Sequence, residues 1–238
     1  FSCVQLNLGR IMTQAFKLII NTSSGHDKKE KALSIIREKL PLIDVVTIEK
    51  SDDFLKKAKA AILAAKTDGS IVVAAGGDGS INAVAGLCLE HDVPMGVLPM
   101  GTFNFFARDL KIPVDLSEAL DVLLTGKLAH VPVGMLNGQI FLVHAGIGLY
   151  SEIMRNREKD KRKFGRFRIV AFISSFLSLM RTKKIHSVAI ETETEEINRQ
   201  TLNIFVGNNV LQLEKLGLVA NNEVKPDELA VILLKPMS

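Results

Sequence analysis

Hydrophobic and polar residues follow two alternating patterns in the first half of the chain. Short apolar runs typical of buried strands occur at residues 16–20, 44–48, 71–75 and 95–98. Between them, apolar residues recur every three or four positions, which predicts amphipathic helices. Strands that alternate with helices form a parallel sheet with helices on both faces. The pattern therefore predicts an α/β domain over residues 12–126, with residues 1–11 as an upstream extension.

The pattern changes after a turn at residues 125–127, where we place the boundary between two domains. Strand-like segments follow at residues 131–133, 139–144, 187–193, 202–206 and 229–234. One helical stretch, at about residues 149–182, interrupts them. We therefore expect residues 127–238 to form a β-rich, sandwich-like domain with a helical insertion.

Composition excludes several classes of protein. Hydrophobic residues make up 47% and charged residues 24% of the 238 residues, which is typical of a globular chain with a buried core. The two cysteines and five scattered histidines provide neither a disulfide framework nor a zinc site, and this favours the reducing cytoplasm. No apolar run reaches the roughly 18 residues that a membrane-spanning helix needs. We expect a cytoplasmic protein.

The net charge of +4 is unevenly distributed along the chain. Eight basic and two acidic residues lie between Arg155 and Arg168, a local charge of +6, so the rest of the chain carries about −2. A confined basic patch disfavours general nucleic-acid binding. An apolar run follows at residues 169–180. Two interpretations stay open: a helix that packs on the second domain, and a basic surface that binds anionic lipids on the inner face of the membrane.

A glycine-rich turn, Gly76–Ser80, lies between the third apolar run and a predicted helix. Backbone N–H groups of successive glycines and of a helix N-terminus bind anions, so the turn suits a polyphosphate. It lacks the closing GK[ST] of a Walker A loop, and Asn82 stands where GxGxxG requires glycine. Asp78 predicts either Mg²⁺ between the carboxylate and the phosphates or a carboxylate that orients the acceptor hydroxyl. An aspartate that only supports the turn is the alternative.

Two further turns follow neighbouring strands. The segment at residues 96–104, GVLPMGTFN, ends in a Gly-Thr turn that carries Thr102, and Asn21–Gly25 follows the first apolar run. Because the carboxyl ends of parallel strands meet at one edge of a sheet, we expect the three turns to form one polar shelf. That edge is where open α/β sheets bind their ligands.

These segments resemble the diacylglycerol kinase catalytic-domain family, the lipid kinases that include the sphingosine kinases. The segments in the first half are IINTSSG (19–25), VTIEKSDD (46–53), GGDGSINAV (76–84) and PMGVLPMGTFNFFARDLKIP (94–113). Those in the second half are GIGLYSEIMRNRE (146–158), FGRF (164–167) and IFVGNNVLQLEKLGL (204–218). The resemblance implies a Rossmann-like domain followed by a β-sandwich-like domain, an arrangement shared with NAD kinase, with ATP between them.

For function, the resemblance implies an ATP- and Mg²⁺-dependent transferase of phospholipid metabolism, which moves the γ-phosphate of ATP to the hydroxyl of a membrane lipid. Asp78 is its predicted catalytic residue. The predicted ATP contacts are Asn21, Thr22, Ser23, Ser24, Gly25, Thr47, Gly76, Gly77, Asp78, Gly79, Ser80, Ile81, Asn82 and Thr102. Ser80 stands where the family has threonine and keeps the hydroxyl. Arg108 and Lys111, beside the second turn, are further candidates for phosphate contacts.

Two motifs of the family are reduced in this sequence. The acidic loop that holds a structural Mg²⁺ is represented by Asp227 alone, and the late Asp-Gly-Glu motif that supplies a general base is absent. We therefore expect the second domain to be incomplete at its C-terminus, with a sheet edge that a second copy of the chain can pair. A homo-oligomer is one consequence of such an edge.

Three alternatives to a lipid kinase stay open: a catalytically incompetent nucleotide- or lipid-binding remnant of the family, an NAD kinase-like enzyme, and a peripheral-membrane adaptor that uses only the basic helix. The motif LPMGTFNFFARDL (98–110) favours the lipid kinases over NAD kinase, and the two glycine turns disfavour the adaptor. The acceptor stays open among diacylglycerol, a sphingoid base, phosphatidylglycerol and an undecaprenol-like alcohol, since apolar pockets carry little sequence signature.

Overall fold

The computed structural model describes residues 2–6, 15–21, 26–49, 51–127, 129–148, 185–192, 195–208 and 228–234. The chain folds into two compact units. The first comprises Phe1–Val143 and Asn209–Asn221, and the second comprises His144–Asn208 and Asn222–Ser238. Each unit has its own sheets.

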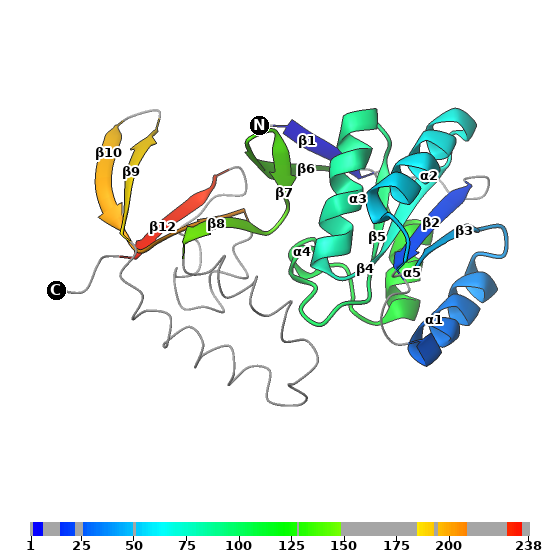
Figure 1. Ribbon diagram of the computed structural model, residues 1–238. Helices are drawn as coiled ribbons and strands as arrows, with labels where there is room; N and C mark the ends of the chain where they lie inside the picture. Colours follow the sequence, from blue (N-terminus) through cyan, green and yellow to red (C-terminus); the bar gives the residue numbers. More distant parts are fainter. Residues whose placement is uncertain are drawn as a thin grey trace. The chain divides into compact units, whose positions relative to one another are not determined.

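A four-stranded parallel sheet forms the centre of the first unit (Figure 1). Its strands are β2 (Phe16–Asn21), β3 (Asp44–Ile48), β4 (Ile71–Gly76) and β5 (Met95–Pro99), in the order β3-β2-β4-β5. They coincide with the four apolar runs, so the predicted parallel α/β fold is confirmed. Because β2 and β4 are the central strands, all but the last residue of each is buried.

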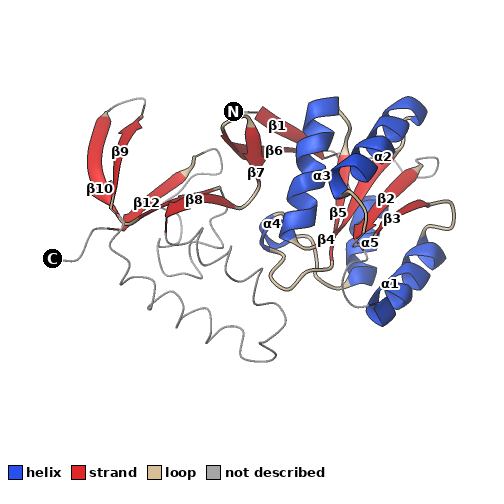
Figure 2. Ribbon diagram, in the orientation of Figure 1, coloured by secondary structure: helices blue, strands red, loops and turns tan. Residues whose placement is uncertain are grey.

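Helices cover both faces of this sheet (Figure 2). The helices are α1 (His26–Lys39), α2 (Phe54–Asp68), α3 (Asp78–His91), α4 (Phe105–Asp109) and α5 (Leu116–Thr125). Successive strand residues point to opposite faces. Ile19 therefore packs with α2 and α3, whereas Leu18 and Ile20 pack with α1 and α5. Burying a side chain of this size stabilises the fold by about 1.5–3 kcal/mol.

Short polar side chains cap two of these helices. The Asp53 carboxylate accepts a hydrogen bond from Lys56 N at the start of α2, at 3.2 Å. The Asp115 carboxylate accepts from Ser117 N and Glu118 N at the start of α5, at 2.9 and 3.1 Å. Each cap satisfies backbone donors that a helix N-terminus leaves unpaired, which explains why the helices begin at these residues.

A buried lysine near the amino-terminal end of β2 forms two ion pairs. Lys17 is 6% exposed and forms ion pairs with Asp44, at the start of β3, and with Asp68, at the end of α2, the second at 3.5 Å. The hydrogen bond to Asp44 is the main cause of a raised Lys17 pKa, which exceeds its ordinary value of 10.5. The ion pairs lie at the end of the strands opposite the glycine turn, so they serve the fold.

Lys17→Met is expected to lower the free energy of unfolding at neutral pH by about 1–2 kcal/mol, because it removes charged hydrogen bonds. A raised folded-state pKa adds stability that is present below pH 10.5 and is lost as the pH rises through the folded-state pKa. The difference between wild type and variant in urea unfolding should therefore shrink in strongly alkaline buffer. A difference that does not change with pH would contradict this role.

A β-hairpin and an additional strand complete the first unit. β6 (Ala129–Leu136) and β7 (Gln139–Phe141) join through Asn137 and Gly138, whose φ values of 50° and 78° suit a tight hairpin turn. β1 (Ser2–Leu6) pairs antiparallel with β6. Residues 2–6 of the expected upstream extension thus form a strand, a pairing between remote segments that local pattern does not reveal.

The division between the units lies after Val143, whereas the sequence placed a boundary near residues 125–130. The reason is a contact between α3 and the hairpin. The Asn82 side chain donates to Ile140 O at 3.2 Å and accepts from Leu142 N at 2.8 Å. The hairpin therefore belongs to the α/β unit, and the single strand predicted at 139–144 is divided into β7 and the following strand.

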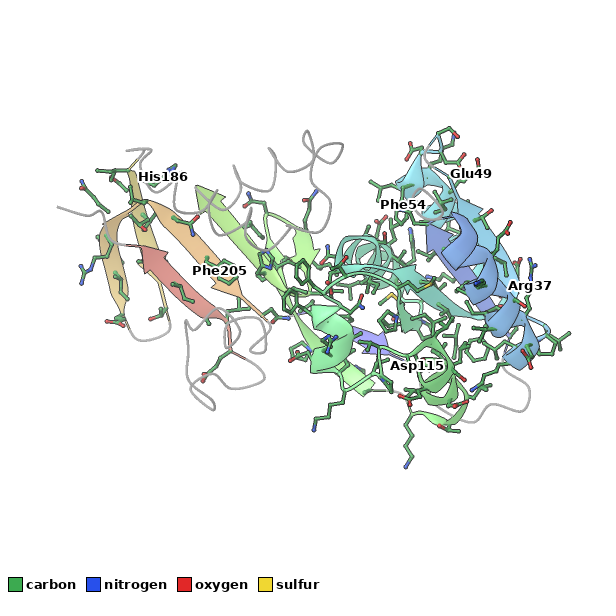
Figure 3. All side chains as sticks on the ribbon, turned by 90° about the horizontal axis from the view of Figure 1, so that it is seen from below. Arg37, Glu49, Phe54, Asp115, His186 and Phe205 are labelled. Carbon is green, nitrogen blue, oxygen red and sulfur yellow. The ribbon has the colours of Figure 1, made fainter. Side chains whose placement is uncertain are left out.

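The second unit is β-rich, as predicted. β8 (His144–Gly148), β11 (Asn203–Gly207) and β12 (Ala230–Leu234) form an antiparallel sheet with β11 in the middle, and β9 (His186–Glu191) pairs with β10 (Glu196–Thr201). The ring of Phe205, labelled in Figure 3, stacks on that of His144 with centroids 5.0 Å apart. Phe205 is 4% exposed, so this stack is part of the core of the sheet.

The predicted helical insertion at 149–182, with its basic residues, lies outside the described residues, and so does Asp227. Among the helices that the structure describes, none has the length and apolar character required to cross a membrane.

Candidate functional site

The glycine turn connects β4 to α3 at the carboxyl edge of the parallel sheet. Gly77 is the N-cap residue of α3, and no side chain of the described residues caps this helix. Ser80 N and Ile81 N donate to Gly77 O, at 3.0 and 3.1 Å. Between described residues, the preceding N–H groups of Asp78 and Gly79 donate to no hydrogen bond. The turn therefore presents backbone donors of the kind that bind anions.

The two predicted turns lie against each other. Met100 N donates to Gly76 O at 2.8 Å. A β-carbon on Gly101 would lie 2.5 Å from the Cα of Gly77, closer than real contacts allow. Glycine at position 101 is thus required by close approach of two backbones. The expectation that these two turns share one edge of the sheet agrees with this packing.

Gly79 differs from the other glycines of the turn. A β-carbon on Gly76 would lie 2.9 Å from the Cβ of Ser80, so packing explains that glycine. A β-carbon on Gly79 would meet no heavy atom within 4 Å in the described part of the chain, and Gly79 is exposed in the first turn of α3. The fold does not require glycine there, and the open space admits a ligand close to the helix backbone.

Asp78 connects the glycine turn to α4. Its Oδ1 accepts a hydrogen bond from Phe106 N at 3.1 Å, and the residue is half-buried. The described residues place no hydrogen bond or ion pair on its second oxygen. Asp78 therefore contacts α4 through one oxygen, and no described residue engages the other.

The arrangement fits Mg²⁺ only in part. Mg²⁺ is usually held by one or two carboxylates together with phosphate oxygens and water. Among the described residues no group of three or more His, Cys, Asp or Glu side chains forms a metal site. Asp78 alone suits a Mg²⁺ ion whose other ligands come from a nucleotide and water.

The other predicted contacts are placed as follows. Thr102 is exposed in the second turn, and Thr47 is exposed on β3. Ile81 is fully buried in the core, so only its backbone is available. The Asn82 side chain is hydrogen-bonded at both ends, to Ile140 O and Leu142 N, so it joins α3 to the hairpin segment. Its predicted phosphate contact stays a prediction.

Asn21 ends β2 and is half-buried, whereas residues 22–25 lie outside the described residues. Arg108 Nε donates to Phe103 O at 3.0 Å, and Lys111 is exposed with a φ of 57°. Their phosphate contacts stay predictions. The sequence pattern did not single out Asn104. The available indication was its position between a Gly-Thr turn and a predicted helix.

An α/β unit with two glycine turns packed together at the carboxyl edge of its sheet is typical of nucleotide- and phosphate-binding domains. Within that class, residues 15–136, about half of the chain, match the family model for the diacylglycerol kinase catalytic domain. The chain belongs to this diacylglycerol kinase catalytic-domain family. The match favours the lipid kinases over the NAD kinase alternative.

Individual relatives agree with this assignment. A diacylglycerol kinase of Staphylococcus saprophyticus is 28% identical over 214 residues, covering 86% of this chain and 68% of the relative. One of Staphylococcus aureus is 30% identical over the same length, covering 86% and 66%. The chain spans about half to two thirds of the length of the curated relatives that it matches.

Solved structures show the same fold. The crystal structure of a diacylglycerol kinase from Bacillus anthracis superposes with a TM-score of 0.67 at 24% identity, covering 95% of this chain and 75% of that one. A second structure from that organism, described as a diacylglycerol kinase by similarity, gives 0.68 at 24% identity, with 95% and 76% covered.

Proposed function

We propose that this chain is a lipid kinase, which transfers the γ-phosphate of ATP to the hydroxyl of a membrane lipid of the diacylglycerol type. One observation carries the proposal: among the described residues, the first turn of α3 has no side-chain cap and open space at Gly79, it contains Asp78, and it follows a glycine that packs against the turn of Thr102. A phosphate bound there would accept hydrogen bonds from backbone N–H groups. Membership of the lipid kinase family supports this interpretation of the turn.

In phosphoryl transfer the protein mainly positions the reactants and neutralises charge. The Asp78 and Gly79 N–H groups and the Ser80 and Thr102 hydroxyls hold phosphate oxygens. Mg²⁺ would supply positive charge across the phosphates. The free oxygen of Asp78 orients that ion or the acceptor hydroxyl, while its other oxygen keeps α4 in place.

We further propose that the enzyme works at the inner face of the membrane, with Arg155–Arg168 toward anionic lipids. The local charge of +6 supports this, since each basic residue near such a surface contributes about 1 kcal/mol. Sedimentation with anionic vesicles should weaken as salt rises. Reversing Arg155, Arg157, Lys161 and Arg162 to Glu should release the protein, and unchanged sedimentation would remove the membrane role.

The kinase proposal is tested with radiolabelled ATP, Mg²⁺ and vesicles that contain diacylglycerol, sphingosine, phosphatidylglycerol or undecaprenol in separate reactions. We expect label in the extracted lipid of at least one reaction, and its loss when EDTA removes the metal. Calorimetry with Mg·ATP runs in parallel. Nucleotide binding without labelled lipid would instead establish a binding remnant of the family, and no binding at all would reject the proposal.

A further inference from the structure

Asn104 holds the loop between β5 and α4 in shape, and the sequence assigned it no function. Its Oδ1 accepts a hydrogen bond from Gly101 N at 2.8 Å, and its Nδ2 donates to Gly101 O at 3.2 Å. One side chain thus pairs with both backbone groups of Gly101. Asn104 is 5% exposed, so these hydrogen bonds are shielded from water.

The backbone of Asn104 is in the left-handed region, with φ 52° and ψ 44°. Few residues other than glycine adopt this conformation, and asparagine is the most tolerant of them. Strained positions of this kind persist where the surrounding structure fixes them, often beside functional sites. Here the two hydrogen bonds to Gly101 provide that support.

Burial of the residues at the tip of the loop does not fix its conformation. Thr102 and Phe103 are both exposed. On the carboxyl side, Arg108 Nε donates to Phe103 O, and the Phe103 ring stacks on that of Phe105. On the amino side, Gly101 lies against Gly77 of the glycine turn, and Asn104 closes the loop back onto Gly101. The position of Thr102 relative to the first turn of α3 therefore depends on Asn104.

We propose that Asn104 is a positioning residue for nucleotide binding: by fastening Gly101 against Gly77, it holds the Thr102 hydroxyl toward phosphates bound at the first turn of α3. The inference rests on the proposed function, because that function supplies the phosphates. In this proposal the Asn104 side chain affects ligand binding through Thr102 and does not contact the ligand itself.

Asn104→Gly tests the proposal because glycine keeps the left-handed backbone and removes both hydrogen bonds. We expect Mg·ATP, measured by calorimetry on the whole chain, to bind about tenfold more weakly, the loss that corresponds to one or two hydrogen bonds. Asn137→Gly is the matched control. Asn137 is also a left-handed asparagine, with φ 50°, but it lies in the exposed β6–β7 turn, so its replacement should leave the affinity unchanged.

Asn104→Asp is the second variant if Asn104→Gly does not fold. It keeps the acceptor for Gly101 N and replaces the donor to Gly101 O by an oxygen, so binding should fall several-fold. A double-mutant cycle with Thr102→Val then separates positioning from general destabilisation. If Asn104 acts through Thr102, Asn104→Gly should cause no further loss of affinity in the Thr102→Val background, so the double variant should bind as Thr102→Val alone does.

The possible outcomes distinguish a failure of the inference from a failure of the proposed function. Additive losses in the cycle, or equal Mg·ATP affinity of Asn104→Gly and Asn137→Gly, would overturn the inference and leave the proposed function intact. Wild-type protein that binds no Mg·ATP would overturn both the proposed function and the inference that depends on it.

Discussion

Asp78→Asn is expected to lower phosphate transfer to lipid by roughly 10²- to 10⁴-fold, the range for loss of a general acid–base group, without a change in the unfolding midpoint. Asparagine retains the oxygen that accepts from Phe106 N, so the contact with α4 is kept. What it lacks is the negative charge that a Mg²⁺ ion or an acceptor hydroxyl requires. The measurement is labelled lipid per unit of protein, alongside urea unfolding.

Asp115→Asn is the matched control for this experiment. Asp115, labelled in Figure 3, also accepts backbone hydrogen bonds at a helix N-terminus, on α5, outside the glycine turns. Its replacement should change neither activity nor stability by much.

Asp78→Ala should lose activity as Asp78→Asn does and should also lower the free energy of unfolding by about 1 kcal/mol, because the contact with Phe106 N disappears. If Asp78→Asn kept full activity, the carboxylate of Asp78 would have no catalytic function and would only support the turn.

Gly79→Ala is expected to weaken Mg·ATP binding by roughly ten- to a hundredfold while the protein becomes slightly more stable. The methyl group meets no protein atom within 4 Å in the described structure, so the fold tolerates it. It occupies the space above the first turn of α3, where overlap with a phosphate would cost about 1–3 kcal/mol. Alanine also favours a helix over glycine by about 0.5–1 kcal/mol. Calorimetry and thermal unfolding measure the two effects.

Two other glycines provide the comparison. Gly86→Ala places a methyl group in the same helix at an ordinary 3.6 Å from Ile140, so it should stabilise α3 without affecting nucleotide binding. Gly101→Ala should destabilise the protein itself, since its β-carbon would lie 2.5 Å from Gly77. If Gly79→Ala binds Mg·ATP as the wild type does, phosphates do not occupy the first turn of α3.

Much of the fold was predictable because its signals are local. The apolar runs at 71–75 and 95–98 are strands, and the helical spacing of Ile81, Ala85 and Cys88 places these residues in the core. β1 and the hairpin's membership in the first unit were not predictable. Both depend on pairing between segments more than fifty residues apart, as in the contact of Asn82 with Leu142.

The candidate site divides in the same way. Sequence indicated the glycine turn, Asp78 and Thr102, since glycines and a carboxylate after a buried strand have few structural uses. It did not reveal that the Asn82 side chain hydrogen-bonds the backbone of Ile140 and Leu142, because those residues are about sixty positions away. It did not single out Asn104, because only the folded backbone shows that this residue is left-handed and paired with Gly101.

The amino-acid sequence by itself determined the α/β character of the first unit, the β-rich character of the second and the family, because periodicity and contiguous motifs are properties of neighbouring residues. Only the tertiary structure decided which glycines are required by packing and which backbone groups the side chains of Asp78, Asn82 and Asn104 hydrogen-bond. Those answers depend on distances between remote backbones, such as Gly77 and Gly101, that no local pattern specifies.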